Sequence, residues 1–148
     1  MIALGSDHGG FALKQELMKH LEARGFEYKD YGTYSDASCD YPVYGKAVAH
    51  AVASGECERG IIICGTGIGI SIAANKVSGV RAALCGDCFS AEMTRLHNDA
   101  NILCFGARVV GYGLACDLVD AFLGAAFEGG RHQTRVDMIT AIEEEERK

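Results

Sequence analysis

Short apolar runs alternate along the chain with longer segments in which apolar residues recur every three or four positions. Residues 26–31 form a more polar run than the others, which favours a strand at a sheet edge. Residues 60–64 form a continuous apolar run rich in branched side chains, which is typical of a parallel strand buried on both faces. In all, the apolar runs predict strands over residues 2–6, 26–31, 60–64, 80–84 and 102–105.

Helices are predicted between these strands from apolar spacing and from glycine and proline. Leu13, Leu17 and Leu21 recur every four residues after the first strand, and a glycine follows as a helix stop. The next helix begins at Asp40-Tyr41-Pro42, because proline is tolerated in the first turn, and it ends by Gly55. Further helices are expected over residues 70–76, 89–97, about 113–122 and about 131–148.

Strand and helix alternate five times with short connections, and no repeat, linker or low-complexity segment interrupts them. This order predicts one α/β domain over residues 1–148, with a parallel sheet, helices on both faces and right-handed crossovers. The last helix has no strand after it, so we expect it to pack on its own chain or to reach a partner subunit.

Composition narrows the class of protein. The 148 residues suit one domain, and the net charge of −6 argues against broad binding to nucleic acid or anionic membranes. The first residues lack the basic start and long apolar core of a signal peptide, and no apolar run approaches the ~20 residues of a membrane span. The seven cysteines are odd in number and scattered, which indicates reduced thiols and a cytoplasmic protein.

The third predicted strand leads into the most informative stretch of the chain, Cys64-Gly65-Thr66-Gly67-Ile68-Gly69. A cysteine at the end of a strand, before a glycine-rich loop and a helix start, offers a nucleophile or base beside N–H groups that can hold an anion. The loop is not the dinucleotide fingerprint, which requires glycine where Ile70 stands, and it is not a P-loop. The alternatives are a glycine turn needed only for backbone shape and an inert core thiol.

Other polar residues are expected near the ends of predicted elements. Asp7 and His8 follow the first strand, and they would share a crevice with Cys64 if the first and third strands are neighbours. The simpler interpretation is that Asp7 caps a helix and His8 lies on the surface. His97 and Asn98 end a helix, where histidine is often only a favourable partner of the helix dipole.

Arg131 and Arg135 are four residues apart and therefore share one face of the last predicted helix. The same stripe continues to the apolar residues Met138 and Ile142, so we expect it to be buried. Two buried arginines near a helix start need an anion, which could be a carboxylate, a partner subunit or a phosphate. Arg108, after the fifth strand, is a third candidate, with an exposed loop arginine as the alternative.

Cys85 and Cys88 form a C-x-x-C pair between a strand and a helix. Such a pair can be a redox dithiol or half of a zinc site. The aromatic and proline neighbours usual beside a redox pair are absent, and no second pair of ligands completes a zinc site. The rest of the sequence therefore supports neither role.

Taken together, motifs along nearly the whole chain resemble the ribose-5-phosphate isomerase B family, within a wider group that includes galactose-6-phosphate isomerase subunits. No single motif is specific, but the ordered set is. The resemblance implies a Rossmann-like three-layer sandwich with a five-stranded parallel sheet and an extra C-terminal helix. The matching motifs are Gly5-Ser6-Asp7-His8-Gly9-Gly10, Asp40-Tyr41-Pro42, Cys64-Gly65-Thr66-Gly67-Ile68-Gly69, Ala73-Ala74-Asn75-Lys76, His97-Asn98-Asp99-Ala100-Asn101, Phe105-Gly106-Ala107-Arg108 and the Arg131/Arg135 pair.

The resemblance also implies an aldose–ketose isomerase that interconverts ribose 5-phosphate and ribulose 5-phosphate without cofactor or metal. Cys64 would be the base that moves a proton between C2 and C1 through an enediolate, and Thr66 would assist it by a hydrogen bond. His97 would open the sugar ring by proton transfer. The backbone N–H groups that would hold the developing oxyanion are those of Gly65, Gly67, Ile68 and Gly69.

The remaining residues carried over from the family bind substrate. Asp7 and Asn98 would contact the sugar, and Tyr41 is a further candidate contact. Family dimers build each site from both chains, so a homodimer is expected, with a tetramer left open. The phosphate would be bound by Arg108, Arg131, Arg135 and His8, some of them from the partner chain.

Three competing hypotheses remain. The chain could isomerise a six-carbon sugar phosphate such as allose 6-phosphate, and only the volume of the site would separate that from the five-carbon reaction. It could be a phosphosugar-binding module without chemistry, although an intact set of Cys64, Thr66 and His97 argues against this. It could also be a redox protein that uses Cys85 and Cys88.

Overall fold

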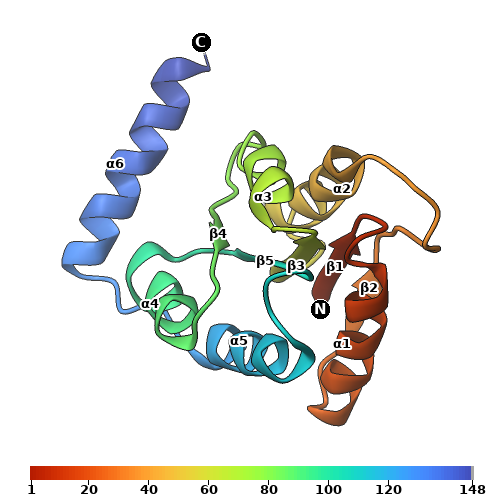
Figure 1. The fold of residues 1–148 in the computed structure, drawn as a ribbon. Helices are drawn as coiled ribbons and strands as arrows, with labels where there is room; N and C mark the ends of the chain where they lie inside the picture. Colours follow the sequence, from red (N-terminus) through yellow and green to blue (C-terminus); the bar gives the residue numbers. More distant parts are fainter. Residues whose placement is uncertain (148) are drawn as a thin grey trace.

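The computed structural model describes residues 1–147 and contains a five-stranded sheet in which all strands are parallel (Figure 1). The strand order is β2-β1-β3-β5-β4, so the short and partly polar β2 lies at an edge, as predicted. β1 and β3 are neighbours, which brings the ends of the first and third strands together. The strands are β1 (Ile2–Ser6), β2 (Tyr28–Asp30), β3 (Arg59–Cys64), β4 (Ala82–Leu84) and β5 (Ile102–Gly106).

Each predicted helix is also present in this part of the chain, with shifts at its ends. The smallest, α3, begins two residues before its predicted start, because Gly67 adopts a left-handed φ of 80° that opens the helix. The strand β4 begins two residues late, since the N–H of Arg81 bonds to the side chain of Asn101 at 2.8 Å. Lys148, the end of the predicted last helix, lies outside the described residues. The helices are α1 (Phe11–Ala23), α2 (Tyr41–Ala53), α3 (Ile68–Ala74), α4 (Cys88–Asn98), α5 (Tyr112–Gly124) and α6 (Arg131–Glu146).

The sheet is the middle of three layers. Helices α1, α4 and α5 cover one face, and α2 and α3 cover the other (Figure 1). Side chains alternate along β3, so that Ile61 and Ile63 join the first core while Ile62 and Cys64 join the second. The α/β sandwich implied by the family resemblance is confirmed, and Cys64 belongs to the face that carries α2 and α3.

Helix α6 projects away from the body of the molecule and packs chiefly against α4 (Figure 1). Its far half is tethered to the segment before β4, because Glu143 accepts the N–H of Gly79 at 3.2 Å and Arg147 donates to the carbonyl of Lys76 at 2.9 Å. None of the helices within residues 1–147 combines the length and the apolar character needed to cross a membrane.

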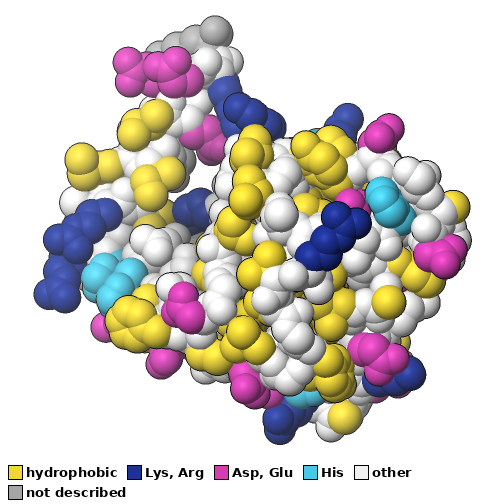
Figure 2. All heavy atoms as spheres, viewed as in Figure 1, with side chains coloured by type: hydrophobic (Ala, Val, Ile, Leu, Met, Phe, Trp, Pro, Cys, Tyr) yellow, Lys and Arg dark blue, Asp and Glu magenta, His cyan; other side chains and the backbone are white. Residues whose placement is uncertain are grey.

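The prediction of a buried arginine stripe on the last helix is wrong for the single chain. Arg131, Arg135 and the rest of that stripe are exposed, whereas the buried residues of α6 are His132 and Val136. The two stripes start one residue, or about 100°, apart. Which of them faces inward depends on where α4 lies, and the sequence of α6 does not contain that information. Figure 2 shows Lys or Arg and apolar side chains gathered along α6.

Lys14 is a fully buried cation that ties α1 to the segment after β2. Its Nζ donates to Asp30 Oδ1 at 2.6 Å and to the carbonyl of Thr33 at 2.5 Å. Burial lowers the pKa of Lys14, and the Asp30 carboxylate opposes that shift. The segment held in this way borders β1, because the N–H of Thr33 donates to the carbonyl of Ser6 at 2.7 Å. Lys14 therefore supports the turn in which Asp7 and His8 lie.

We expect Lys14→Met to lower the free energy of unfolding by about 3–5 kcal/mol, because it leaves the Asp30 carboxylate without its partner. Lys19→Met is the matched control, since Lys19 pairs with Glu16 on the exposed side of the same helix and its loss should cost about 0.5 kcal/mol or less. Urea unfolding at pH 7 measures both values. Equal effects of the two substitutions would contradict a stabilising role for the buried pair.

Candidate active site

Cys64 ends β3 and lies at the carboxyl edge of the sheet, opposite Gly106 of β5. Its side chain is buried, with 5% of the residue exposed. The N–H of Gly67 donates to Cys64 Sγ at 3.1 Å, which holds the sulfur against the loop that follows. Gly67 needs its glycine, because a Cβ there would lie 2.6 Å from the backbone of Phe105. The sulfur is thus fixed by close backbone packing between β3 and β5.

The glycine loop offers fewer N–H groups to a ligand in this chain than predicted. The N–H of Gly67 is used by Cys64, and that of Ile68 donates to Thr66 Oγ1 at 3.2 Å. Within residues 1–147, the N–H groups of Gly65 and Gly69 have no acceptor. An oxyanion could therefore use those two groups without rearrangement of the loop. The predicted hydrogen bond from Thr66 to Cys64 stays a prediction, since the Thr66 hydroxyl here closes the first turn of α3.

The turn after β1 lies against the same loop. A Cβ on Gly9 would be 3.6 Å from the N of Gly65, so the two backbones nearly touch. Asp7 is buried, and its Oδ1 accepts the N–H of Gly10 at 3.1 Å, which shows that it also stabilises the turn before α1. His8 is half-buried, and its Nδ1 accepts the N–H of Cys39 at 3.1 Å.

Tyr41 and Arg108 border the loop from two further elements. Tyr41 begins α2, and its ring lies so close to Gly69 that a Cβ there would be 2.5 Å from the tyrosine Cζ. Arg108 follows β5, and a Cβ on Gly65 would be 3.6 Å from its guanidinium. The backbone N–H of Arg108 also donates to the carbonyl of Gly65 at 3.0 Å. One edge of the sheet therefore collects the predicted residues Asp7, His8, Tyr41, Cys64, the Gly65–Gly69 loop and Arg108.

His97 and Asn98 lie at the opposite edge of the sheet. They end α4, which runs back from the carboxyl edge to the amino edge, and β5 starts at Ile102 shortly after them. Since Ile102 pairs with Gly60 and Gly106 pairs with Cys64, the length of β5 separates the two ends. At ~3.3 Å per residue, that separation is roughly 13 Å or more. His97 therefore cannot act on a sugar bound at Cys64 of its own chain.

The surroundings of His97 contain two residues that sequence reasoning missed. His97 Nε2 lies 3.3 Å from Oε1 of Glu128, in the loop after α5, and its ring stacks on that of His132 with centroids 4.1 Å apart. Burial lowers the pKa of His132, and the neighbouring His97 and Arg131 add to that effect. His132 could have been found in the sequence as the residue next to Arg131, but Glu128 lies in a segment without a periodic pattern.

The two predicted phosphate-binding arginines lie on the same helix as His132. Arg131 and Arg135 are exposed, and neither forms an ion pair with a carboxylate anywhere in residues 1–147. Figure 2 shows histidine beside Lys or Arg side chains at the base of α6. The amino edge therefore presents a cationic surface with a pair of histidines, whereas Cys64 lies at the carboxyl edge.

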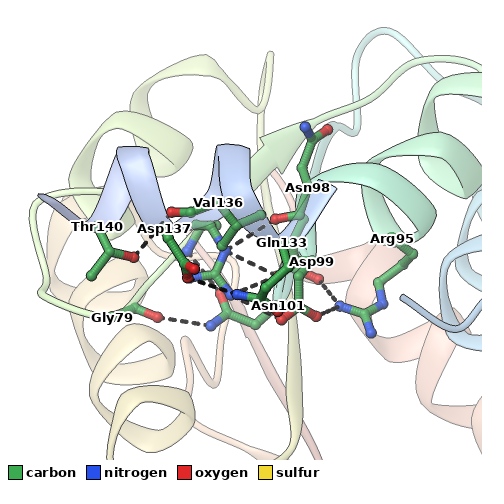
Figure 3. Close-up of polar contacts among 11 residues, drawn as sticks. Gly79, Arg95, Asn98, Asp99, Asn101, Gln133, Val136, Asp137 and Thr140 are labelled. Carbon is green, nitrogen blue, oxygen red and sulfur yellow. Dashed lines mark hydrogen bonds and ion pairs between the residues drawn. The ribbon is translucent and has the colours of Figure 1, made fainter. Parts of the chain in front are cut away.

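Asp99 fixes the end of α4 that carries His97 and Asn98. The Arg95 guanidinium is buried and donates to Asp99 Oδ1 at 2.8 Å, while Arg81 donates to the carbonyl of Asp99 at 2.9 Å (Figure 3). Asp99 itself has a left-handed φ of 46°, which ends the helix. In Figure 3 the side chain of Asn98 points away from this network, so its amide is free to contact a ligand.

The C-x-x-C pair does not have the properties of a redox dithiol. Cys85 is buried, and burial raises its pKa to about 11, with a smaller contribution from Asp87. A reactive thiol needs a lowered pKa and access to solvent. The surroundings of Cys85 therefore argue against the redox hypothesis.

Two hollows in the surface do not involve Cys64. One of about 690 Å³ lies between α6 and residues 75–83, and the other of about 930 Å³ lies between α2 and the end of α3. Cys64 lies instead at the carboxyl edge of the sheet, beside the loop N–H groups and Arg108.

Comparison with known proteins identifies the family. The sequence profile described as Ribose/Galactose Isomerase matches residues 2–139. The chain belongs to the ribose/galactose isomerase family. Within that family it is 59% identical to "Ribose-5-phosphate isomerase B" of Escherichia coli, over 97% of this chain and 96% of the relative.

Solved structures of family members have the same fold. Ribose-5-phosphate isomerase B of Clostridium thermocellum superposes with a TM-score of 0.96 at 59% identity, covering 97% of each chain. The protein of Mycoplasma genitalium, solved with bound ribulose-5-phosphate, superposes with a TM-score of 0.92 at 44% identity, over 97% of this chain and 96% of that one. The ribose/galactose isomerase fold therefore extends over the whole domain, α6 included.

We expect Asp99→Ala to lower the free energy of unfolding by about 3 kcal/mol, because the buried Arg95 guanidinium loses its carboxylate. Asp137→Ala is a suitable control, since Asp137 is exposed on α6 and bonds only to Gln133; its change should stay within about 0.5 kcal/mol. Urea unfolding of both variants tests this, and a loss below 0.5 kcal/mol for Asp99→Ala would be the contrary result.

Proposed function

We propose that this protein is an aldose–ketose isomerase that interconverts ribose 5-phosphate and ribulose 5-phosphate. The observation that carries the proposal is the 59% identity to ribose-5-phosphate isomerase B of Escherichia coli over nearly the full length of both chains. The geometry of the carboxyl edge supports the proposal, because it brings together a cysteine, free N–H groups and an arginine. An isomerase of this kind needs a catalytic base, an oxyanion hole and a phosphate-binding group.

In the proposed reaction, Cys64 acts as the base. The thiolate removes the proton from C2 of the open-chain aldose, the electrons form the C1–C2 double bond of an enediolate, and negative charge develops on O1. The N–H groups of Gly65 and Gly69 would stabilise that charge. Hydrogen-bond donors that are already oriented toward a developing oxyanion cost little free energy of reorganisation. A proton then passes from O2 to O1 of the enediolate. The thiol returns its proton to C1 while the C2–O2 carbonyl forms, which gives the ketose and regenerates the thiolate. Thr66 would support the thiolate by a hydrogen bond.

We propose that His97 opens the sugar ring in the site of a partner subunit. Because His97 and Cys64 lie at opposite edges of the sheet, two copies of the chain are needed to bring them together. The exposed apolar residues Met138, Ile139 and Ile142 on α6 offer a surface for that contact. The expected assembly is a homodimer with two shared sites.

The same arrangement suggests the substrate contacts. Arg131 and Arg135 lie on α6 and would bind the phosphate from the partner chain, while Arg108 and His8 would bind it from the chain that supplies Cys64. The sugar would lie between Asp7 and Tyr41 on one side and Asn98 of the partner on the other. Binding the phosphate would orient the reacting carbons against the sulfur.

The proposed reaction moves one proton between adjacent carbons and leaves the oxidation state of the molecule unchanged. It therefore requires no redox cofactor, and the side chains named above supply the proton transfer without a metal. We also place the protein in the cytoplasm, a proposal supported by seven free cysteines in the part of the chain that the structure describes.

The test of the function is turnover of ribose 5-phosphate to ribulose 5-phosphate by protein treated with a chelator. We expect wild-type activity, and we expect Cys64→Ala to lower turnover by ~10³-fold with substrate binding largely intact, because only the base is lost. Cys88→Ala, which removes a thiol at the start of α4 that has no role in the proposed reaction, should keep normal turnover. Loss of activity in the Cys88 variant together with retention in the Cys64 variant would overturn the assignment of the base.

A second prediction concerns the shared site. Cys64→Ala and His97→Ala should each be nearly inactive on cyclic ribose 5-phosphate, but refolding them together should restore activity. In random dimers, half of the molecules are mixed and carry one intact site, so about a quarter of wild-type activity is expected. A mixture no more active than its parents would show that the two residues do not meet across an interface.

A further inference from the structure

His97, Glu128 and His132 come from three elements and meet at the amino edge of the sheet. His97 ends α4, Glu128 lies in the loop after α5, and His132 is in the first turn of α6. One side-chain ligand atom from each lies within 4.8 Å of the others. The N–H of Glu128 also donates to the carbonyl of Leu96 at 3.0 Å, which holds its loop against the end of α4. The cluster is thus anchored by backbone contacts.

The chemistry of these three groups matches a zinc-class dication. Two imidazole nitrogens and a carboxylate oxygen, with one position left for water, form a common set of zinc ligands. With zinc–ligand bonds of ~2.0–2.1 Å, two ligand atoms of a tetrahedral site lie ~3.4 Å apart. His97 Nε2 and Glu128 Oε1 already lie 3.3 Å apart. All three ligand atoms lie within 4.8 Å of one another, so the His132 nitrogen has to move closer to the other two to complete a tetrahedral set.

His132 has a property that the proposed isomerase reaction does not use. Its residue is 7% exposed, yet its ring nitrogens have no hydrogen-bond partner among residues 1–147. The ring nitrogens are not among the fully enclosed polar atoms of this part of the chain, so an ion can reach them from solvent.

We propose that His97, Glu128 and His132 bind a zinc-class divalent cation, and that the bound ion removes His97 from ring opening. The metal site stands on the geometry alone, whereas the inhibitory effect rests on the proposed function. Arg131 and Arg135, on the stripe of α6 next to that of His132, oppose a dication, and the carboxylate of Glu128 offsets part of that repulsion. An ion held by two nitrogens and one oxygen occupies the lone pair that His97 would need to exchange a proton with the sugar.

The binding experiment titrates metal-free full-length protein with Zn²⁺ by calorimetry and follows histidine side chains by NMR. We expect one ion per chain and zinc-dependent shifts at His97 and His132. Glu128→Gln should weaken binding by at least ~10-fold, as should His132→Gln. His50→Gln, at an exposed position of α2, and Cys88→Ala are the controls and should bind as wild type does. Circular dichroism checks that His132→Gln is folded, and Glu128→Gln, at an exposed position, gives the same answer independently.

Two binding results would overturn the proposal. Unchanged zinc affinity in both Glu128→Gln and His132→Gln would exclude the cluster, and loss of binding in Cys88→Ala would assign the ion to the thiol pair.

A kinetic measurement tests the inhibitory effect separately. Zinc should slow turnover of cyclic ribose 5-phosphate but spare an open-chain substrate, and Glu128→Gln should need at least ~10-fold more zinc for the same inhibition. Equal inhibition of both substrates would overturn the effect on ring opening. A wild-type protein that bound zinc at the cluster without any isomerase activity would support the metal site and count against the proposed function.

Discussion

The direction of the strands is the constraint on which the rest of the structure depends. In an all-parallel sheet every strand ends at one edge, and every connecting helix returns to the other. Cys64 ends a strand and His97 ends a helix, so their separation follows from chain direction rather than from local detail. The same rule gathers Asp7, Cys64 and Arg108, each of which follows or ends a strand, at a single edge. The topology therefore sorts the candidate residues into two half-sites.

Close backbone packing fixes the half-site around Cys64. Gly106 shows how tight it is, since a Cβ there would lie 2.5 Å from the backbone of Thr66. Tyr41 closes over Gly69 in the same way, and the Gly67 N–H holds the sulfur. Glycine is needed at these positions because two loops and a ring approach one another within contact distance. Lys14 is not part of the half-site, but it holds the segment that pairs with the end of β1.

The parallel sheet and the helical layers could be predicted from the sequence, because short apolar runs, periodic helices and glycine stops all point to the same α/β pattern. The strand order comes from the structure. The placement of Asp7, Cys64 and Arg108 at one edge could be predicted because each follows or ends a strand. The buried face of α6 could not, since Arg131 and His132 are neighbours and only the position of α4 decides which of them turns inward. The contact between His97 and Glu128 could not either, because it joins a helix end to an irregular loop. These failures concern tertiary contacts that no local periodicity records.

In the mechanism proposed above, the opposite placement of Cys64 and His97 would make catalysis a property of an assembly rather than of a single chain. Each subunit would contribute the base to one site and the ring-opening histidine to the other. A folded monomer would therefore lack a complete site and be inactive. Specific activity would then depend on protein concentration, falling on dilution as subunits separate while the fold of each remains intact. A change at the subunit interface that weakens association would lower turnover without altering any reacting group. The activity of such an enzyme could therefore be controlled through the association of its subunits.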